Sequence, residues 1–294
     1  MPYLLLVLTT LFWSGNFVLS RGMHADIPPL GLSFWRWSIA LVILSLFGIR
    51  HLWKQRSLVR SHLGFIVLQG LLGVAGFNTL IYMAIQSTTA INAVLVNSCI
   101  PVLIALFSWI LYKERMTPRQ CFGVLVSLGG VLLIISRGDI AQLLAVKFNR
   151  GDLLVLAATF IWALYSANLR RYPKGLHPFA YQSGIVIIGL VAILPFYVME
   201  LLDGKSMTLN VSTVLTILYV ALFASVLAFI FWNRAVRTIG ANRAGPFIHL
   251  MPAFSTILAV IFLGETIQPY HLKGIILIFS GILMTTVLIR REKT

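Results

Sequence analysis

Five residues of this chain recur at the same spacing further along the sequence, and this repeat constrains the fold more than any other feature. The first set is Pro101, Glu114, Pro118, Gly123 and Gly130, and the second is Pro252, Glu265, Pro269, Gly274 and Gly281, each 151 positions later. The start of the chain shows the same relation at an offset of 149, where Trp13 corresponds to Trp162. Apolar composition does not produce matched prolines, glycines and a glutamate in ungapped register. The sequence therefore contains two copies of one structural unit.

The composition assigns both copies to a membrane. Hydrophobic residues make up 59% of the chain, charged residues only 11%, and the mean hydropathy is +0.92, whereas soluble domains contain about 25% charged residues. A membrane-spanning helix needs about 17–25 apolar residues. Such stretches lie at 3–20, 29–49, 64–86, 90–111, 119–136, 153–169, 177–199, 213–235, 242–263 and 270–289.

Each copy holds five of these stretches, and five is an odd number, so the second copy must cross the membrane in the opposite sense to the first. We predict an all-α integral membrane protein with ten transmembrane helices in two inverted five-helix repeats, residues 1–137 and 151–290. Inverted repeats of this kind are common in secondary transporters, where one repeat rocks against the other.

The formal charge of +15 follows the membrane topology and gives no indication of nucleic-acid binding. With the N-terminus in the cytoplasm, 16 Lys and Arg fall in inner loops and 6 in outer loops. The positive-inside rule then predicts an inner-membrane protein with both termini in the cytoplasm. The first span lacks a basic leader and a small-residue cleavage site, so we expect it to remain in the protein.

No acidic residue is predicted in the middle of a span. All eight lie in loops or at span ends: Asp26, Glu114, Asp139, Asp152, Glu200, Asp203, Glu265 and Glu292. This distribution disfavours an exporter of hydrophobic cations, which needs a membrane carboxylate to hold its substrate. The two cysteines have no metal-ligand spacing and enzyme motifs are missing, so we predict no metal, no cofactor and no enzyme.

The spans instead carry neutral polar groups, aromatic rings and one deep cation. Counting residues from the ends of each span puts four polar side chains at the same depth in the membrane, between the midplane and the outer face: Asn16, Arg36, Asn78 and Asn97. Four polar side chains at one depth predict a shared polar cavity. The second copy puts its polar residues between the midplane and the inner face. The candidate substrate-binding residues are Trp13, Asn16, Arg36, Asn78, Tyr82, Asn97, Trp162, Tyr165, Trp232 and His249.

Two of these candidates have competing interpretations. Arg36 either pairs with a substrate carboxylate or phosphate, or extends toward the interface beside Trp35 and Trp37. His249 either relays a proton or serves as a neutral hydrogen-bonding group. Pro101 and Pro252 interrupt helical hydrogen bonding at matched positions, and we interpret them as hinges, with a fixed kink as the alternative.

The chain resembles the drug/metabolite transporter superfamily, in its EamA-like branch. The resemblance rests on Phe12-Trp13-Ser14-Gly15-Asn16-Phe17, Pro29 with Phe34-Trp35-Arg36, Ala84 with Ala90 and Ala93, Pro101 with Lys113-Glu114-Arg115, and Pro252, Gly264-Glu265, Pro269 and Gly274. It implies ten spans, cytoplasmic termini and alternating access, with export of amino acids or other small metabolites. The related small multidrug resistance proteins carry a glutamate in their first span, and this chain has none there.

Together these observations predict a secondary transporter that exports small zwitterionic or anionic metabolites, with amino acids favoured. Arg36 and the asparagines would hold the polar end of the substrate, and Trp13, Trp162 and Tyr165 its apolar part. A sugar-phosphate or nucleotide-type exchanger, a membrane-embedded lipid-handling enzyme and a passive channel stay open as alternatives. The expected partners are the lipid bilayer and a small-molecule metabolite, with no nucleic acid, and a homodimer is an open alternative for the oligomeric state.

Overall fold

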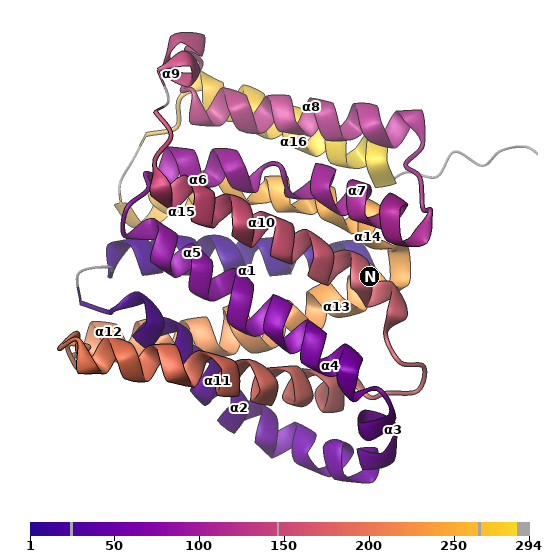
Figure 1. Cartoon of the computed structure of the whole chain (residues 1–294). Coiled ribbons are helices and arrows are strands. Elements are labelled where there is room, and N and C mark those ends of the chain that lie inside the picture. Colours follow the sequence, from indigo (N-terminus) through magenta and orange to yellow (C-terminus); the bar gives the residue numbers. More distant parts are fainter. Residues whose placement is uncertain (24–25, 146, 264–265, 287–294) are drawn as a thin grey trace, which may run out of the picture.

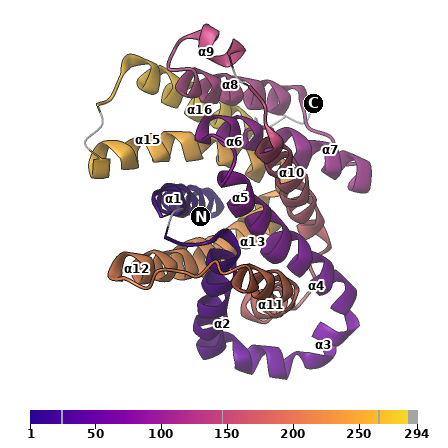
Figure 2. The same cartoon turned by 60° about the vertical axis from the view of Figure 1, so that its left-hand side comes forward.

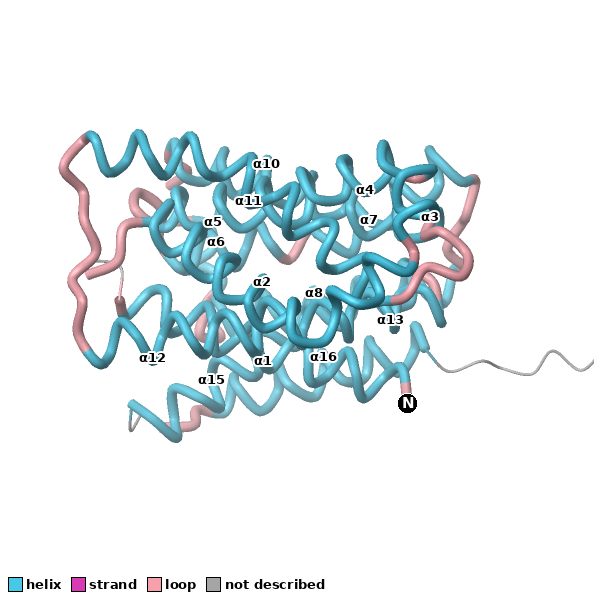
Figure 3. The backbone as a smooth tube through the Cα atoms, turned by 90° about the horizontal axis from the view of Figure 1, so that it is seen from below, coloured by secondary structure: helices cyan, strands magenta, loops and turns pink. Residues whose placement is uncertain are grey.

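A computed structural model of the chain describes residues 1–23, 26–145, 147–263 and 266–286. These residues form helices joined by short connections and contain no β-strand, so the predicted all-α class is confirmed. The long helices run across Figure 1 side by side, and the chain reverses direction at the two ends of the bundle. In Figure 3 the loops accordingly gather at these two ends.

The first repeat begins at the N-terminus. Its elements are α1 (Pro2–Gly22), α2 (Pro29–Lys54), α3 (Arg56–Ser61), α4 (Leu63–Gln69), η1 (Gly70–Gly76), α5 (Phe77–Ile85), α6 (Ala90–Asn97), α7 (Ile100–Tyr112) and α8 (Pro118–Ile135). The short helix α9 (Ile140–Leu144) lies in the connection between the repeats. The second repeat comprises α10 (Arg150–Asn168), η2 (Leu169–Arg171), α11 (Pro178–Leu202), α12 (Val211–Tyr219), η3 (Val220–Leu227), α13 (Ala228–Ile239), α14 (Ala241–Ala244), η4 (Gly245–His249), α15 (Leu250–Leu263) and α16 (Pro269–Thr286).

Within the described ranges, nine helical segments are long and apolar enough to cross a membrane. They correspond to the first nine predicted spans. The tenth predicted span, 270–289, is helical as α16 up to Thr286, and the rest of it lies outside the described residues. Long helices begin where the sequence supplies a suitable start. Proline occupies the first turn of α2, α8, α11 and α16, and Thr117 with Gln120 forms a capping box before α8.

The matched glycines bring α8 and α16 together. A Cβ atom on Gly123 would lie 2.6 Å from the carbonyl oxygen of Gly281, and one on Gly130 would lie 2.5 Å from that of Gly274. Each first-repeat glycine therefore contacts a glycine of the second repeat, in an antiparallel register. Only a residue without a side chain permits this close backbone approach. The repeated glycines of the sequence are thus the contact points between the repeats, and α8 and α16 form one pair at the edge of the bundle in Figure 1.

Both repeats also contain a π-helical segment at the corresponding place. The segment η1 covers Gly70–Gly76 and η3 covers Val220–Leu227, so their first residues are 150 positions apart and their last residues 151. A π-helix widens the turn and leaves carbonyl groups available to side chains. The side chains of Asn78 and Ser225 use such groups, donating to the carbonyls of Gly73 and Val220 at 3.1 and 2.8 Å.

Figure 2 shows α1 surrounded by other helices, with α15 on one side and α12 and α13 on the other. We call the end of the bundle that holds the N-terminus, the end of α7 and the start of α11 the N-terminal face. The other end, with the start of α12 and the end of α15, is the opposite face. The position of the cavity is given below relative to these two faces.

Candidate functional site

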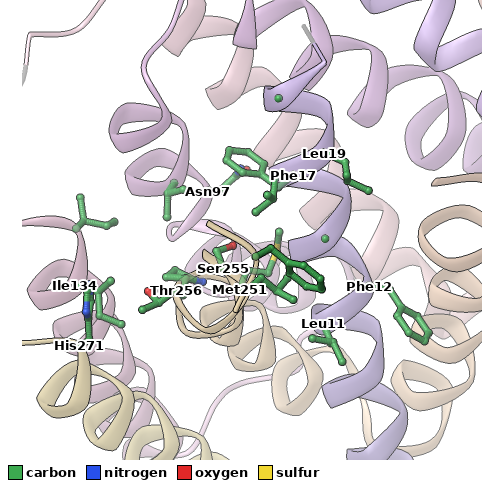
Figure 4. A pocket seen from close by; sticks show the side chains of 18 of the residues that line it. Leu11, Phe12, Phe17, Leu19, Asn97, Ile134, Met251, Ser255, Thr256 and His271 are labelled. Atoms are coloured by element: carbon green, nitrogen blue, oxygen red, sulfur yellow. Dashed lines mark hydrogen bonds between the residues drawn. The ribbon is translucent and has the colours of Figure 1, made fainter. Parts of the chain in front are cut away.

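A cavity of about 1740 Å³ opens beside α1 and extends from the middle of this helix to loops of the opposite face. Elements of both repeats line it: α1, α6 and α8 from the first, and η3, η4, α15 and α16 from the second. Figure 4 shows Asn97 of α6 and Ser255 and Thr256 of α15 near Phe17 of α1. We call this space the central cavity.

The walls of the central cavity are apolar, and a few neutral polar groups interrupt them. Its apolar lining includes Leu11, Phe12, Phe17, Val18, Leu19, Val94, Ile134, Ile135, Tyr219, Phe223, Met251 and Phe262. The polar groups inside are Asn97, Ser98, Ser255 and Thr256, and Arg137, Thr266, Gln268 and His271 line the cavity toward the opposite face. The described lining contains no Asp or Glu. Asn97 lines the cavity, and its Oδ1 atom is buried without a hydrogen-bond partner.

The two repeats cross at the floor of this cavity. The imidazole Nε2 of His249 lies 3.0 Å from the carbonyl oxygen of Ser98, and Nδ1 lies 2.7 Å from the hydroxyl of Ser127. Since the Ser98 oxygen is only an acceptor, Nε2 must carry a proton and donate it. Both ring nitrogens are thus occupied, and His249 connects η4 to α6 and α8.

The prolines lie directly beside this crossing. Pro252 lines the central cavity, whereas Pro101 packs behind it, where a Cβ atom on Gly245 would lie 3.4 Å from its Cα atom. A proline has no N–H group, so Pro101 cannot donate to the carbonyl of Asn97, and Pro252 cannot donate to that of Ile248. Both Asn97 and Ile248 line the cavity. The helix interruptions therefore border the same space in both repeats.

Arg36 is fully buried in a polar cluster between α2, α5, η3 and α1. Its Nε donates to the hydroxyl of Ser225 at 2.8 Å, and its Nη1 donates to Asn78 Oδ1 at 3.0 Å and also to the Tyr82 hydroxyl. The Tyr82 hydroxyl in turn donates to Asn16 Oδ1 at 3.1 Å. We call these five residues the Arg36 cluster.

The charge of Arg36 has no counter-ion within the described chain. The only ion pair described there joins Arg170 to Glu114, and the Nη2 atom of Arg36 is buried without a partner. An unpaired cation and an unused donor are costly inside a membrane protein, and such groups mark sites that meet a ligand. None of the five cluster residues lines the central cavity, but Gly15 and Phe17, the neighbours of Asn16 in α1, do.

Three tryptophans pack together on the N-terminal side of the cavity. The ring centroid of Trp13 lies 5.0 Å from that of Trp162 and 5.4 Å from that of Trp232, and the last two are 5.7 Å apart. Tyr165 stacks on Trp162 with ring centroids 5.1 Å apart, and Phe229 contacts Trp162 edge to face at 5.6 Å. This tryptophan cluster fills the interior between the cavity and the N-terminal face.

A second polar network lies beyond the tryptophan cluster. The Tyr165 hydroxyl donates to Asn233 Oδ1 at 2.7 Å, and Asn233 Nδ2 donates to Gln182 Oε1 at 3.2 Å. The Tyr165–Asn233 bond corresponds to the Tyr82–Asn16 bond of the first repeat, because Tyr165 is 149 positions after Asn16 and Asn233 is 151 after Tyr82. The same tyrosine-to-asparagine bond thus occurs in both repeats with the two residue types exchanged.

The predicted site residues therefore form several groups. Asn16, Arg36, Asn78 and Tyr82 lie in one cluster, Trp13, Trp162 and Trp232 in another, Tyr165 joins the second-repeat network, and Asn97 and His249 lie at the cavity and its floor. Asn97 does not join Arg36, although depth counting put them at one level. Counting residues gives the depth of a residue along its helix axis, but it does not give the direction in which the side chain points around that axis.

Sequence reasoning missed Ser225, Ser98, Ser255 and Thr256 as site residues. Small hydroxyl residues are frequent in membrane helices and give no separate signal. The carbonyl of Ala224, which accepts a hydrogen bond from Trp13 Nε1 at 3.1 Å, was equally hidden, because it belongs to a π-helical turn.

The N-terminal face is closed by contacts between the repeats. Glu114 forms an ion pair with Arg170, and the Tyr112 hydroxyl donates to Asn168 Oδ1 at 2.6 Å. On the other side of the bundle, Gln55 donates to the carbonyl of Gly175 at 2.8 Å and accepts from the backbone N–H of His177 at 2.7 Å. The cavity is therefore accessible from the opposite face and sealed toward the N-terminal face.

The comparisons with known proteins agree with this architecture. "Uncharacterized transporter YyaM" of Bacillus subtilis is 27% identical over 99% of this chain and 95% of its own length. A "Probable amino-acid metabolite efflux pump" of Escherichia coli is 24% identical over 98% of this chain and 96% of its own length. One solved crystal structure, 22% identical, shares the fold with a TM-score of 0.81 over 100% of this chain and 99% of the other.

The family is identified by a match over both repeats. The sequence model of the EamA-like transporter family matches residues 1–136 and again residues 149–287. These two matches cover most of the chain and coincide with the two sets of five long helices. The chain is a multi-pass membrane protein of the transporter kind, and it belongs to the EamA-like transporter family.

Proposed function

We propose that this protein is a secondary active transporter that exports small zwitterionic or anionic metabolites by alternating access, with amino acids as the leading substrates. The observation that carries the proposal is the central cavity. It lies where the repeats cross, is open toward one face only, and contains neutral polar groups without any described acid. A site without a carboxylate has no group that would hold a cationic drug.

The substrate class follows from the charge of the surroundings. Arg36 is the only buried Lys or Arg among the described residues, and one arm of its guanidinium is unused. A guanidinium is well suited to a carboxylate, because it donates two parallel hydrogen bonds. The unused Asn97 Oδ1 accepts a hydrogen bond and suits an ammonium group. An amino acid carries both groups, and its side chain would contact the apolar walls.

Arg36 reaches the substrate when α1 moves. In the described state Asn16 of α1 bonds to Tyr82 of the Arg36 cluster, while the adjacent Gly15 and Phe17 face the cavity. A small rotation or tilt of α1 would expose the Arg36 cluster to a bound substrate. Pro101 and Pro252 would act as the hinges of this movement, since each interrupts the helix that borders the substrate.

The orientation in the membrane follows from the basic residues. The predicted inner loops within the described residues hold 13 of the 23 Lys and Arg, and these loops lie at the N-terminal face. We therefore assign the N-terminal face to the cytoplasm, both termini to the cytoplasmic side and the protein to the inner membrane. The described conformation is then outward-open, the state from which an exporter releases its substrate. The Escherichia coli relative, named as a probable amino-acid metabolite efflux pump, supports the same direction and substrate class.

Flux measurements in proteoliposomes test this proposal. Labelled amino acids, a sugar phosphate and a nucleotide are offered to the purified protein, with and without a pH gradient. We expect saturable flux of one or more amino acids and loss of this flux in Arg36→Ala. Equal flux in the wild type and in Arg36→Ala removes Arg36 from the site. Flux of the phosphates alone, a chemically converted product, or a current that does not saturate would support the exchanger, the enzyme or the channel instead.

A further inference from the structure

A second, much smaller cavity lies on the N-terminal side of the tryptophan cluster. Its volume is about 10 Å³, the size of one water molecule. It is lined by residues of the α10–α11 connection, α11 and α13: Tyr172, Pro178, Tyr181, Gln182, Ile230, Asn233, Arg234 and Arg237. We call it the entry cavity.

Gln182 of the entry cavity and the adjacent Gln69, which does not line the cavity, have buried polar atoms without partners. Gln182 is fully buried, and its Oε1 accepts from Asn233, but its Nε2 has no partner. The neighbouring Gln69 donates from Nε2 to the Tyr165 carbonyl and the Tyr181 hydroxyl, both at 3.2 Å, while its Oε1 has no partner. One free donor and one free acceptor thus lie in the same network. Buried groups without partners cost stability, so their retention indicates a ligand that uses them in another state.

Two arginines border the same cavity at the protein surface. Arg234 and Arg237 are exposed and make no ion pair with any described residue. The Arg237 guanidinium lies 3.5 Å from the ring centroid of Tyr172, whose ring lies 4.7 Å from that of Tyr181. Tyr172, Arg237 and Gln182 all line the entry cavity, so the stack of Arg237 on Tyr172 borders the space beside Gln182. Arginine on an aromatic face is held weakly enough to be displaced by a carboxylate.

We propose that the entry cavity is the closed form of a substrate entry site on the N-terminal face. A small carboxylate, such as an amino acid, binds there with its carboxylate between Gln182 Nε2 and the arginine pair, and Gln69 Oε1 accepts from its ammonium group. Arg237 and Tyr172 form the lid. The inference rests on the proposed export of such substrates, because an exporter must receive its substrate from the side that is closed in the described state.

The repeat symmetry also supports this site. The Tyr165–Asn233 bond is the second-repeat counterpart of the Tyr82–Asn16 bond, and Tyr82 accepts a further hydrogen bond from Arg36. In an inverted repeat, a group assigned to the substrate in one conformation has a counterpart suited to the same role in the opposite conformation. Asn233 is the counterpart of Tyr82, and it lines the entry cavity.

Sided labelling of one cysteine tests the site without requiring transport. Ile230→Cys is introduced together with Cys99→Ser and Cys121→Ser, and vesicles of known orientation are treated with an anionic or a cationic methanethiosulfonate. Val186→Cys is the matched control, because Val186 is buried in α11 but does not line the entry cavity. We expect labelling of Ile230→Cys from the N-terminal face only. The ratio of the labelling rate with the anionic reagent to that with the cationic reagent should be about tenfold higher for Ile230→Cys than for a free thiol in solution. Arg237→Gln should abolish this difference.

Substrate dependence is tested with L-leucine, L-glutamate and L-lysine as probes. We expect one or more of them to slow the labelling of Ile230→Cys. Gln182→Met should raise the half-saturating concentration of the amino acid about tenfold when the amino acid is offered on the N-terminal side. The half-saturating concentration on the opposite face should not change. Ser183→Ala is the control. Ser183 follows Gln182 in α11, and its hydroxyl is likewise buried without a partner, but Ser183 does not line the entry cavity.

The outcomes separate this inference from the proposed function. Amino-acid flux without any N-terminal labelling of Ile230→Cys, or with equal preference for both reagents, overturns the entry site. Labelling with the expected charge preference but without amino-acid flux leaves the entry site intact and refutes the assigned substrates. A Gln182→Met variant that changes both sides equally shows a structural role and also overturns the inference.

Discussion

His249 and Ser98 occupy the same position in the two repeats, 151 residues apart, and they are hydrogen-bonded to each other at 3.0 Å. Trp13 and Trp162, also counterparts, meet in an edge-to-face contact with ring centroids 5.0 Å apart. Residues related by a two-fold axis contact each other only when they lie close to that axis. The axis of the inverted repeat therefore passes between these pairs, next to the floor of the central cavity. The contact region is thus suited to a movement that exchanges the roles of the two repeats.

Removing the close glycine contact should destabilise the protein. In Gly123→Ala the new Cβ would lie 2.6 Å from the backbone carbonyl of Gly281, so α8 and α16 must separate. We expect a loss of about 1–3 kcal/mol in the free energy of unfolding, measured as a lower melting temperature in detergent. Gly129→Ala, in the same helix, has no atom within 4 Å of the new Cβ and should leave the melting temperature unchanged or raise it. Equal effects of the two variants would contradict the assignment of the glycine contact.

Replacing Arg36 should separate transport from folding. Arg36→Met removes a buried charge that has no counter-ion in the described chain, so the protein should remain folded, while substrate flux should vanish. Arg36→Lys retains the charge but loses the planar donor geometry that serves Ser225 and Asn78. We expect less than about a tenth of the wild-type flux in Arg36→Lys, because a compact ammonium cannot serve these acceptors and a carboxylate together. Substantial flux in Arg36→Met would exclude a role in substrate binding.

The unused acceptor of the cavity should contribute to affinity. Asn97→Leu preserves the size of the side chain and removes its Oδ1, which is buried and without a partner. We expect the dissociation constant of the substrate to rise about five- to tenfold, the effect of one hydrogen bond. Isothermal calorimetry or a binding-induced shift in melting temperature measures this change. Ser108→Ala is the control, because it removes another buried polar group without a partner, one that lies outside the cavity. The dissociation constant of the substrate for Ser108→Ala should equal that for the wild type.

The matched prolines should affect the rate of transport more than binding. Pro252→Ala restores an N–H group toward Ile248 and straightens the helix beside the cavity. We expect slower flux at saturating substrate with an unchanged dissociation constant, and the same result for Pro101→Ala. Pro195→Ala is the control, because Pro195 lies inside α11, is exposed and does not border the cavity. A normal maximal rate in both repeat variants would identify the prolines as fixed kinks.

The contact between His51 and His177 should make stability depend on pH. The two rings are stacked with centroids 3.6 Å apart, and burial together with the neighbouring His51 lowers the pKa of His177. A histidine with a lowered pKa in the folded state binds fewer protons there than in the unfolded chain. Its neutral form therefore supports the fold fully above about pH 6.5, and this support is lost as the pH falls below that value.

Melting temperatures at different pH values test this histidine contact. We expect the melting temperature of the wild type to decrease between pH 7.5 and pH 5.5 by more than that of His177→Gln. His62→Gln is a suitable control, because His62 lies on the same face and outside the stacked pair. Parallel pH curves for the wild type and His177→Gln would exclude the stacked pair as the cause.

Depth and sequence pattern predicted part of the site. The height of Asn16, Arg36 and Asn78 along their helices follows from residue counting, and these residues do meet in one cluster. Counting could not separate Asn97 from them, because it does not fix the rotation of a helix about its axis. The π-helical segments shift this rotation further, and they bring Ser225 against Arg36. No residue pattern in either segment indicates a π-helix.

Residue composition and spacing were sufficient to assign the membrane class and to predict ten spans in two inverted repeats, and nine of these spans are described as helices long enough to cross a membrane. These are local or periodic properties: the length of an apolar run, the residues that begin and end a helix, and the distance between matched residues. Three features are visible only in the folded chain: the groups that line the cavity, the hydrogen bond between His249 and its counterpart Ser98, and the closure of one face while the other is open. Contacts between segments that lie far apart in the chain determine how each helix is rotated about its axis and which face is closed. The same sequence must permit these contacts in both an inward-facing and an outward-facing arrangement, so the sequence alone does not select one of them.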